Sequence, residues 1–145
     1  MATGLERLRA MIDGRIDAPP VSRLVGFRIV SAESGRTVFE LEAGPQHANP
    51  MGTLHGGILC DVADAALGTA WVSTLEEGET FTTLELKINF TRPFWTGTLR
   101  AEGRVVSGGR TVGLTACDIT DAEGRLIAHA TSTCMTLRGD AAAGR

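Results

Sequence analysis

Only one segment of this chain has the length and the apolar spacing of a long buried helix. From about residue 56 to 75, apolar side chains recur at the helical period of roughly 100° per residue. They form one stripe made of Leu59, Val62, Ala63, Ala66, Leu67 and Ala70. The small and apolar residues of this stripe predict a helix packed against a sheet.

Strand patterns lie on both sides of this helix. Alternating or extended segments cover residues 25 to 32 and 36 to 43 before it, and 83 to 90, 98 to 106, 110 to 119 and 124 to 136 after it. Short turns separate the later segments, as in antiparallel hairpins. The sequence therefore predicts an α+β fold with one curved antiparallel sheet on one long helix. One helix cannot cover both faces of such a sheet, so the other face or the helix flank is expected to meet a partner subunit.

The two ends of the chain are predicted to be accessory. Leu5, Leu8, Ile12 and Ile16 have helical spacing, which predicts a helix over residues 5 to 16 that ends at Pro19-Pro20. We therefore divide the chain into an N-terminal helix and lead-in (1–20), one domain (21–138) and a flexible tail (139–145).

Composition excludes several classes of function. The chain has 145 residues, 14 Lys and Arg against 17 Asp and Glu, and a net charge of -3, so it lacks the basic surface of a nucleic-acid-binding protein. Cys60, Cys117 and Cys134 have neither zinc-pair spacing nor the even count of a disulfide framework, and we expect reduced thiols and no metal. No apolar run reaches the roughly 20 residues of a membrane span, and no signal-peptide core is present. A cytoplasmic location is expected.

His55-Gly56-Gly57 stands where the irregular chain becomes the long helix. The first N–H groups of a helix have no partner inside it and carry partial positive charge. Two glycines let a ligand approach that backbone closely. The segment is either an ordinary glycine-rich helix start or a site for a developing oxyanion.

Two acids follow within the helix. Asp61 lies roughly opposite the apolar stripe and is interpreted as a solvated or salt-bridged surface acid, whereas Asp64 lies roughly 120° from the stripe centre, on its flank. A carboxylate at such an edge can act as nucleophile or general base, or simply be a boundary acid. Asn49 is either a turn residue before Pro50 or a polar group that lines the pocket, and Thr83 is either an ordinary β-former or a site residue.

The stretch HANPMGTLHGGILCDVADAALGTA resembles the hotdog-fold acyl-CoA thioesterases of the phenylacetyl-CoA thioesterase (PaaI) type. The family pattern is an Asn-containing loop, then G-x-x-H-G-G, then an acid eight residues after the first glycine of HGG. Asn49, Gly56 and Asp64 match it here. The segment TTLELKINFTRPFWTGTLRAEGRVVSGGRT also looks like the second half of the family.

The resemblance implies a sheet wrapped around the long helix, and homodimers or tetramers with active sites at the dimer interface. It also implies roles by position. The Gly56 N–H polarises the thioester carbonyl, beside Gly57, and His55 orients that site. Asp64 of the other subunit attacks or activates water. Asn49 sits near the attacking water or the thioester, and Thr83 assists.

The substrate implied is an aryl-, phenylacetyl- or medium-chain acyl-CoA, with no cofactor other than the coenzyme A of the substrate itself. Arg110, Arg92 and Arg138 are the candidates to meet the CoA phosphates, because a guanidinium makes bidentate hydrogen bonds to phosphate. Two alternatives stay open. One is a non-catalytic acyl-CoA-binding module on the same fold. The other is a hotdog enoyl-CoA hydratase, although residues 47–52 lack the Asp and the His of that family's Asp-x-Asn-Pro-x-His run.

Overall fold

The computed structural model describes residues 2–145. Its helices are α1 (Gly4–Ile12), α2 (Pro20–Val25) and α3 (Gly56–Val72), with short 3-10 turns at Pro45–His47 and Gly139–Ala142. Its strands are β1 (Phe27–Glu33), β2 (Arg36–Ala43), β3 (Thr80–Phe90), β4 (Gly97–Gly108), β5 (Val112–Thr120) and β6 (Leu126–Leu137).

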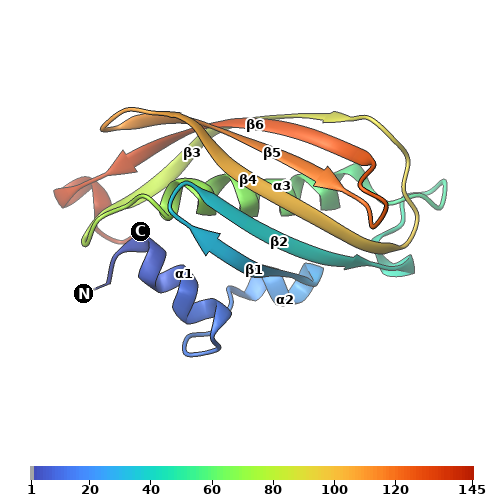
Figure 1. Cartoon of the computed structure of the whole chain (residues 1–145), viewed down its shortest axis with the longest axis horizontal. Coiled ribbons are helices and arrows are strands. Elements are labelled where there is room, and N and C mark those ends of the chain that lie inside the picture. The colour runs from blue at the N-terminus through green and yellow to red at the C-terminus, as the bar shows by residue number, and fades with distance from the viewer. Residues whose placement is uncertain (1) are drawn as a thin grey trace.

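The strands form a six-stranded sheet in the order β1-β2-β4-β5-β6-β3, and every neighbouring pair is antiparallel. The sheet curves over α3, which runs along its inner face (Figure 1). The chain enters α3 from β2 and leaves it into β3, at the opposite edge of the sheet. This architecture confirms the predicted α+β hotdog fold.

The buried side of α3 fits closely against the sheet. A Cβ at Gly103 of β4 would overlap the carbonyl oxygen of Ala66, so glycine is needed where the strand crosses the helix. Thr37 of β2 donates a hydrogen bond from Oγ1 to the same carbonyl, at 3.1 Å. The six stripe residues predicted from the sequence are all buried in this core.

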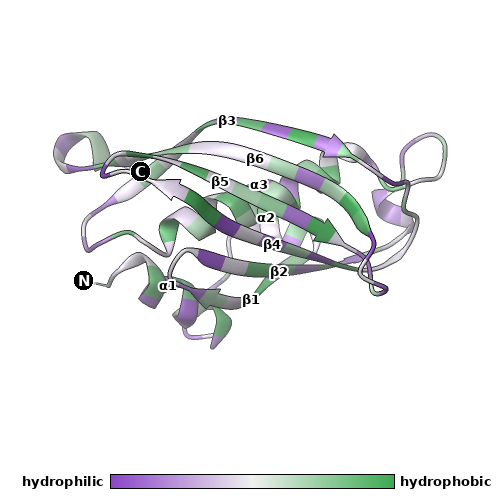
Figure 2. Cartoon of the chain, turned by 45° about the horizontal axis from the view of Figure 1, so that its top comes forward, coloured by the Kyte–Doolittle hydropathy of each residue, from purple (hydrophilic) through white to green (hydrophobic). Residues whose placement is uncertain are grey.

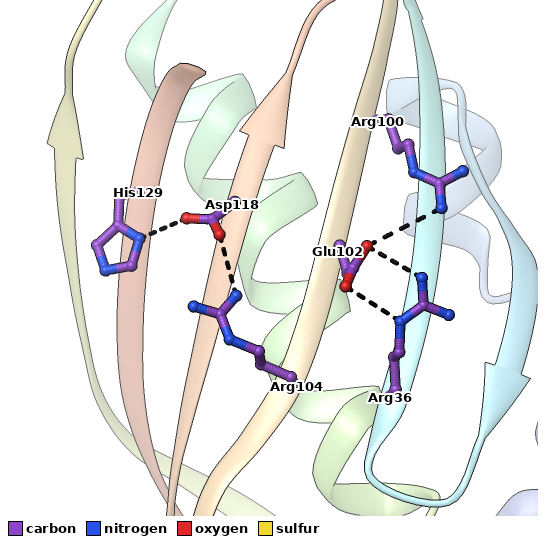
Figure 3. A network of polar contacts seen from close by, with 6 residues as sticks. All are labelled: Arg36, Arg100, Glu102, Arg104, Asp118 and His129. Carbon is purple, nitrogen blue, oxygen red and sulfur yellow. Dashed lines mark hydrogen bonds and ion pairs between the residues drawn. The ribbon is translucent and has the colours of Figure 1, made fainter. Parts of the chain in front are cut away.

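The outer face of the sheet is polar. Hydrophilic and hydrophobic residues alternate along parts of the strands (Figure 2). Successive side chains of a strand point to opposite faces of the sheet, so the outward residues of β2, β4, β5 and β6 meet above it. Arg36 forms a bidentate pair with Glu102, at 3.0 Å for both bonds. Asp118 lies between Arg104 at 3.0 Å and His129 at 2.6 Å (Figure 3). Burial opposes ionisation of Asp118, but these two partners outweigh it and hold the pKa of Asp118 below its ordinary value.

The N-terminal segment differs from the prediction. α1 ends at Ile12 rather than continuing to residue 16, because the chain turns at Gly14, whose φ of 73° is left-handed. The two prolines do not simply end a helix. Pro20 is the first residue of α2, where the fixed φ of proline suits the first helical turn. A helix at this position was not predicted.

α1 is fastened to the end of α3. The Gly4 N–H donates to the carbonyl of Leu75 at 3.0 Å, and a Cβ at Gly4 would overlap the carbonyl oxygen of Val72. α1 and α2 then lie along β1, at one edge of the sheet (Figure 1). The division of the chain at residues 20 and 138, and the flexibility of the last residues, stay predictions.

None of the helices in residues 2–145 combines the length and the apolar character that crossing a membrane requires.

Candidate active site

The start of α3 leaves one backbone donor free. His55 is the N-cap, and its Nδ1 accepts a hydrogen bond from the Gly57 N–H at 2.8 Å. The Gly56 N–H, one residue earlier, donates to no acceptor within residues 2–145. Because this N–H stands at the positive end of a 17-residue helix, it suits an oxygen that becomes negative.

A cavity of about 390 Å³ opens beside this helix start. Asn49, Gly56, Phe90 and Arg92 are among the residues that line it. The side chain of Asn49 is engaged in its own loop. Its Oδ1 accepts from the N–H groups of Met51 at 2.9 Å and Thr53 at 3.1 Å, and its Nδ2 donates to Thr53 Oγ1 at 2.7 Å. Asn49 therefore shapes the loop that feeds the helix and also forms part of the cavity wall.

Asp64 lines a second cavity, of about 230 Å³, on the open flank of α3. Burial, followed by the negative charge of Asp61, raises the pKa of the Asp64 carboxyl. The residue still reaches solvent, so burial here means an apolar surrounding at the cavity mouth rather than enclosure. Asp61 is exposed, as expected for a surface acid, and it also lines the same cavity as Asp64. Residues three apart on a helix are neighbours on its surface, so the two acids lie close together.

Gly56 and Asp64 do not meet within one chain. Eight residues of α3 separate them, or about 12 Å along the helix axis at 1.5 Å per residue, and they line different cavities. A thioester carbonyl bound to the Gly56 of a chain is thus out of reach of the Asp64 of that chain.

Thr83 lies on β3 and pairs with Cys134 of β6, next to a bulge in β3. Burial raises the pKa of the Cys134 thiol, hydrogen bonding from Ser132, Thr115 and Thr83 opposes that rise, and the charge of Asp64 adds to it. Thr83 is not among the residues that line the cavity of Asp64.

The candidate arginines fall at opposite ends of α3. Arg92 lines the cavity of Gly56, whereas Arg110 and Arg138 line a third cavity, of about 460 Å³, next to Trp71 near the end of the helix. Arg138 donates from Nε to Glu79 Oε1 at 2.6 Å and also bonds the carbonyl of Arg110. These contacts hold the Arg138 side chain in the structure of its own chain.

No group of three or more His, Cys, Asp or Glu side chains within residues 2–145 is arranged to hold a metal ion.

The sequence profile of the Thioesterase superfamily matches residues 51–128, more than half of the chain, including the helix start and Asp64. The chain belongs to the thioesterase superfamily. Human acyl-coenzyme A thioesterase 13 is 29% identical to this thioesterase over 136 residues, which cover 92% of this chain and 96% of the human protein.

Solved structures agree with this assignment. A thioesterase family protein from Silicibacter pomeroyi superposes with a TM-score of 0.82 at 30% identity, covering 91% of this thioesterase and 99% of that chain. The PaaI protein of the phenylacetic acid degradation operon of E. coli superposes with a TM-score of 0.83, covering 94% and 98%. Its 22% identity supports the fold alone.

Sequence reasoning missed two parts of this site. The first is Phe90, whose ring lies over Gly56; its place at the end of an alternating strand gave no sign of that contact. The second is the wall that α1, α2 and β1 contribute to the cavity of Asp64, through residues such as Met11, Val21 and Phe27. Pro20 at the start of α2 was the available signal, because proline is favoured at the first position of a helix.

Proposed function

We propose that this thioesterase hydrolyses acyl-CoA thioesters at a site shared by two subunits. The observation that carries the proposal is the separation of Gly56 and Asp64 on one helix, each at its own cavity. A free helix-terminal N–H and an acid with a raised pKa are the two groups that thioester hydrolysis requires. A second copy of the chain supplies the missing member of each pair.

In this mechanism the thioester oxygen accepts a hydrogen bond from the Gly56 N–H of one subunit. Asp64 of the other subunit either takes a proton from water, which attacks the carbonyl carbon, or attacks that carbon itself. The negative charge that forms on oxygen is stabilised by Gly56 and by the dipole of α3. Collapse breaks the C–S bond, and coenzyme A leaves as a thiolate that is then protonated. When water attacks, the free acid forms directly; when Asp64 attacks, water then hydrolyses the acyl–Asp64 anhydride, which releases the free acid and restores the carboxylate. The products of both routes are the free acid and CoA.

The remaining site residues take supporting roles. His55 caps the helix through Gly57 and so fixes the position of the Gly56 N–H. Asn49 lines the cavity next to it. Thr83 is assigned to the region of Asp64, where it assists the acid or the attacking water.

The CoA moiety is assigned to the cavity of Gly56 and its continuation. A neighbouring cavity of about 350 Å³ shares Arg92, Pro93 and Phe94 with it and adds Trp95 and Arg125. We place Arg92 at the CoA phosphates of the Gly56 subunit. Arg110 and Arg138, at the far end of α3, can contribute only from another subunit.

The edge of β3 is the proposed dimer contact. β3 pairs with β6 on one side only, and Leu84 and Phe90 on this strand are 53% and 54% exposed in the single chain. An open edge with exposed apolar residues favours pairing with a second sheet. Whether two dimers form a tetramer, and the cytoplasmic location, remain expectations.

Release of free thiol from a panel of acyl-CoAs tests the proposed reaction. We expect turnover that is lost in Asp64→Asn while acyl-CoA binding is kept. A chain that binds acyl-CoA and releases no thiol in its unaltered form would instead be the non-catalytic binding module.

A further inference from the structure

Most of the residues that line the cavity at Asp64 precede α3 in the chain. They are Met11 of α1, Pro19, Val21 and Ser22 at α2, Phe27 of β1 and Phe39 of β2. The helical side of the cavity is formed by Asp61, Asp64, Ala65 and Thr69. The acid therefore stands at the mouth of a chamber whose depth is set by the N-terminal segment.

The far wall of this chamber is apolar. Phe27 and Phe39 are buried and pack edge to face, with ring centroids 5.8 Å apart and an interplanar angle of 71°. Edge-to-face packing is a favoured arrangement of aromatic rings and stabilises this wall. The charged groups on the chamber, Asp61 and Asp64, are both acidic and both at the helical side. A ligand with a carboxylate at its far end would be repelled by these acids and would meet no cation among the lining residues.

The volume limits the ligand further. A cavity of about 150 Å³ is enough to hold benzene, so the 230 Å³ here holds a ring with a short spacer, or a linear chain of about eight carbons. A chain of about sixteen carbons would not be held entirely within this volume.

We propose that this chamber binds the acyl group of the substrate, and that Val21 and Ala65 set its maximum length. The proposal rests on the proposed thioesterase function, because the carbonyl attacked with the help of Asp64 must lie at the chamber mouth. The substrate class is an uncharged arylacetyl or medium-chain acyl thioester. Long-chain and dicarboxylic acyl thioesters are excluded, the first by volume and the second by the two acids.

Two variants that fill the chamber from opposite walls test this assignment. Val21→Phe adds a ring from α2, and Ala65→Leu adds a side chain from α3, where leucine is a good helix former. Leu24→Phe is the matched control, since Leu24 is on α2, is 84% exposed and does not line the chamber. The measurement is kcat/KM for butyryl-, octanoyl-, phenylacetyl-, palmitoyl- and glutaryl-CoA, with circular dichroism to verify folding.

The unaltered protein should prefer octanoyl- and phenylacetyl-CoA over palmitoyl- and glutaryl-CoA. In both filling variants kcat/KM for the two preferred substrates should fall roughly tenfold or more, which is the discrimination that an apolar pocket makes for one methylene group. The kcat/KM for butyryl-CoA should change by less than about threefold. Leu24→Phe should keep the original profile. An unchanged profile in either folded filling variant, or equal rates on octanoyl- and palmitoyl-CoA in the unaltered protein, would overturn the assignment. Absence of turnover on every thioester would instead count against the proposed function itself.

Discussion

The ring of Phe90 lies against the first residue of α3: a Cβ placed on Gly56 would stand 2.9 Å from Phe90 Cζ. The last residue of β3 and the first residue of α3 therefore touch at the entrance of one cavity. Any side chain at Gly56 must displace this ring, so the glycine has a steric reason to be there that is separate from its N–H.

The two properties of Gly56 can be separated experimentally. In a Phe90→Ala background, where the clash is removed, Gly56→Ala keeps the N–H and Gly56→Pro deletes it. Proline is favoured at the first helical position, and His55 already has the extended backbone, with φ -64° and ψ 133°, that precedes proline. We expect Gly56→Pro to lower kcat about 100-fold or more relative to Gly56→Ala, as for other oxyanion donors. Equal kcat values in the two variants would remove Gly56 from the mechanism.

Asp64→Asn should lower kcat by roughly 100-fold or more, the scale of a lost general base, with KM nearly unchanged. Asp61→Asn should keep most of the activity. Because the charge of Asp61 raises the pKa of Asp64, the acid limb of the pH–kcat profile should move to lower pH in Asp61→Asn. Steady-state kinetics from pH 4 to 8 measure both effects. A comparable loss of kcat in the two variants would mean that the wrong acid has been chosen.

Mixed dimers test the sharing of the site. One subunit carries Asp64→Asn, and the other carries Gly56→Pro with Phe90→Ala. One of the two composite sites then regains both groups and keeps the Phe90 of the Asp64→Asn subunit, so we expect up to about half of the activity of the unaltered dimer. Each homodimer alone should be inactive, and light scattering verifies the dimer. Inactive heterodimers, or a fully active monomer, would contradict the shared site.

Asp64 and Asp118 should have opposite effects on stability. The pKa of Asp64 is raised in the folded chain, whereas in the unfolded chain it is about 4. Between these two pKa values the folded state binds more protons than the unfolded state, so the free energy of unfolding falls as pH rises. Asp64→Asn should therefore match the unaltered Tm near pH 4 and exceed it at neutral pH.

The pKa of Asp118 is lowered in the folded chain, so its stabilisation is full above about pH 4 and is lost as pH falls through its folded pKa. Asp118→Asn should lower the stability at neutral pH by about 1 kcal/mol or less, because the network is partly solvent-screened, and this difference should vanish at low pH. Thermal unfolding monitored by circular dichroism across pH 2–8 checks both signs. Parallel Tm curves for the two variants would refute this account.

Arg92→Ala should raise KM for acyl-CoA about tenfold, the scale of one lost charge-assisted hydrogen bond, with little change in kcat. The increase should shrink at high salt, which screens exposed charges. Arg110→Ala should raise KM less, because it acts only from another subunit. Arg28→Ala is the control, as Arg28 is an exposed arginine on β1 that lines none of these cavities. A KM for Arg92→Ala that equals the control at every salt concentration would disprove the assignment.

Features that depend on local spacing were predictable from the sequence. The bounds of β2 and the start of α3 at His55-Gly56 match the structure, because alternation and helix capping are set by neighbouring residues. The end of α3 was placed near residue 75 but lies at Val72, where Ser73 donates a hydrogen bond from Oγ to the carbonyl of Ala70.

Features that depend on contacts between distant segments were not predictable. Arg138 was a candidate to meet the CoA phosphates, but Glu79, fifty-nine residues earlier, pairs with it. The ring of Phe90 over Gly56 and the wall that Val21 gives to the cavity of Asp64 are likewise set by tertiary packing. A single sequence carries no local signal for such pairs.

The attachment of α1 to the end of α3 through Gly4 has a consequence for how this protein can diverge. It holds residues 2–25 as a cap on the edge of the sheet, and the superfamily profile begins only at residue 51. If the cap limits the acyl chamber, substitutions there alter which thioesters are accepted without touching Gly56 or Asp64. After gene duplication, the two copies would then diverge first in substrate preference, while their catalytic groups stay the same.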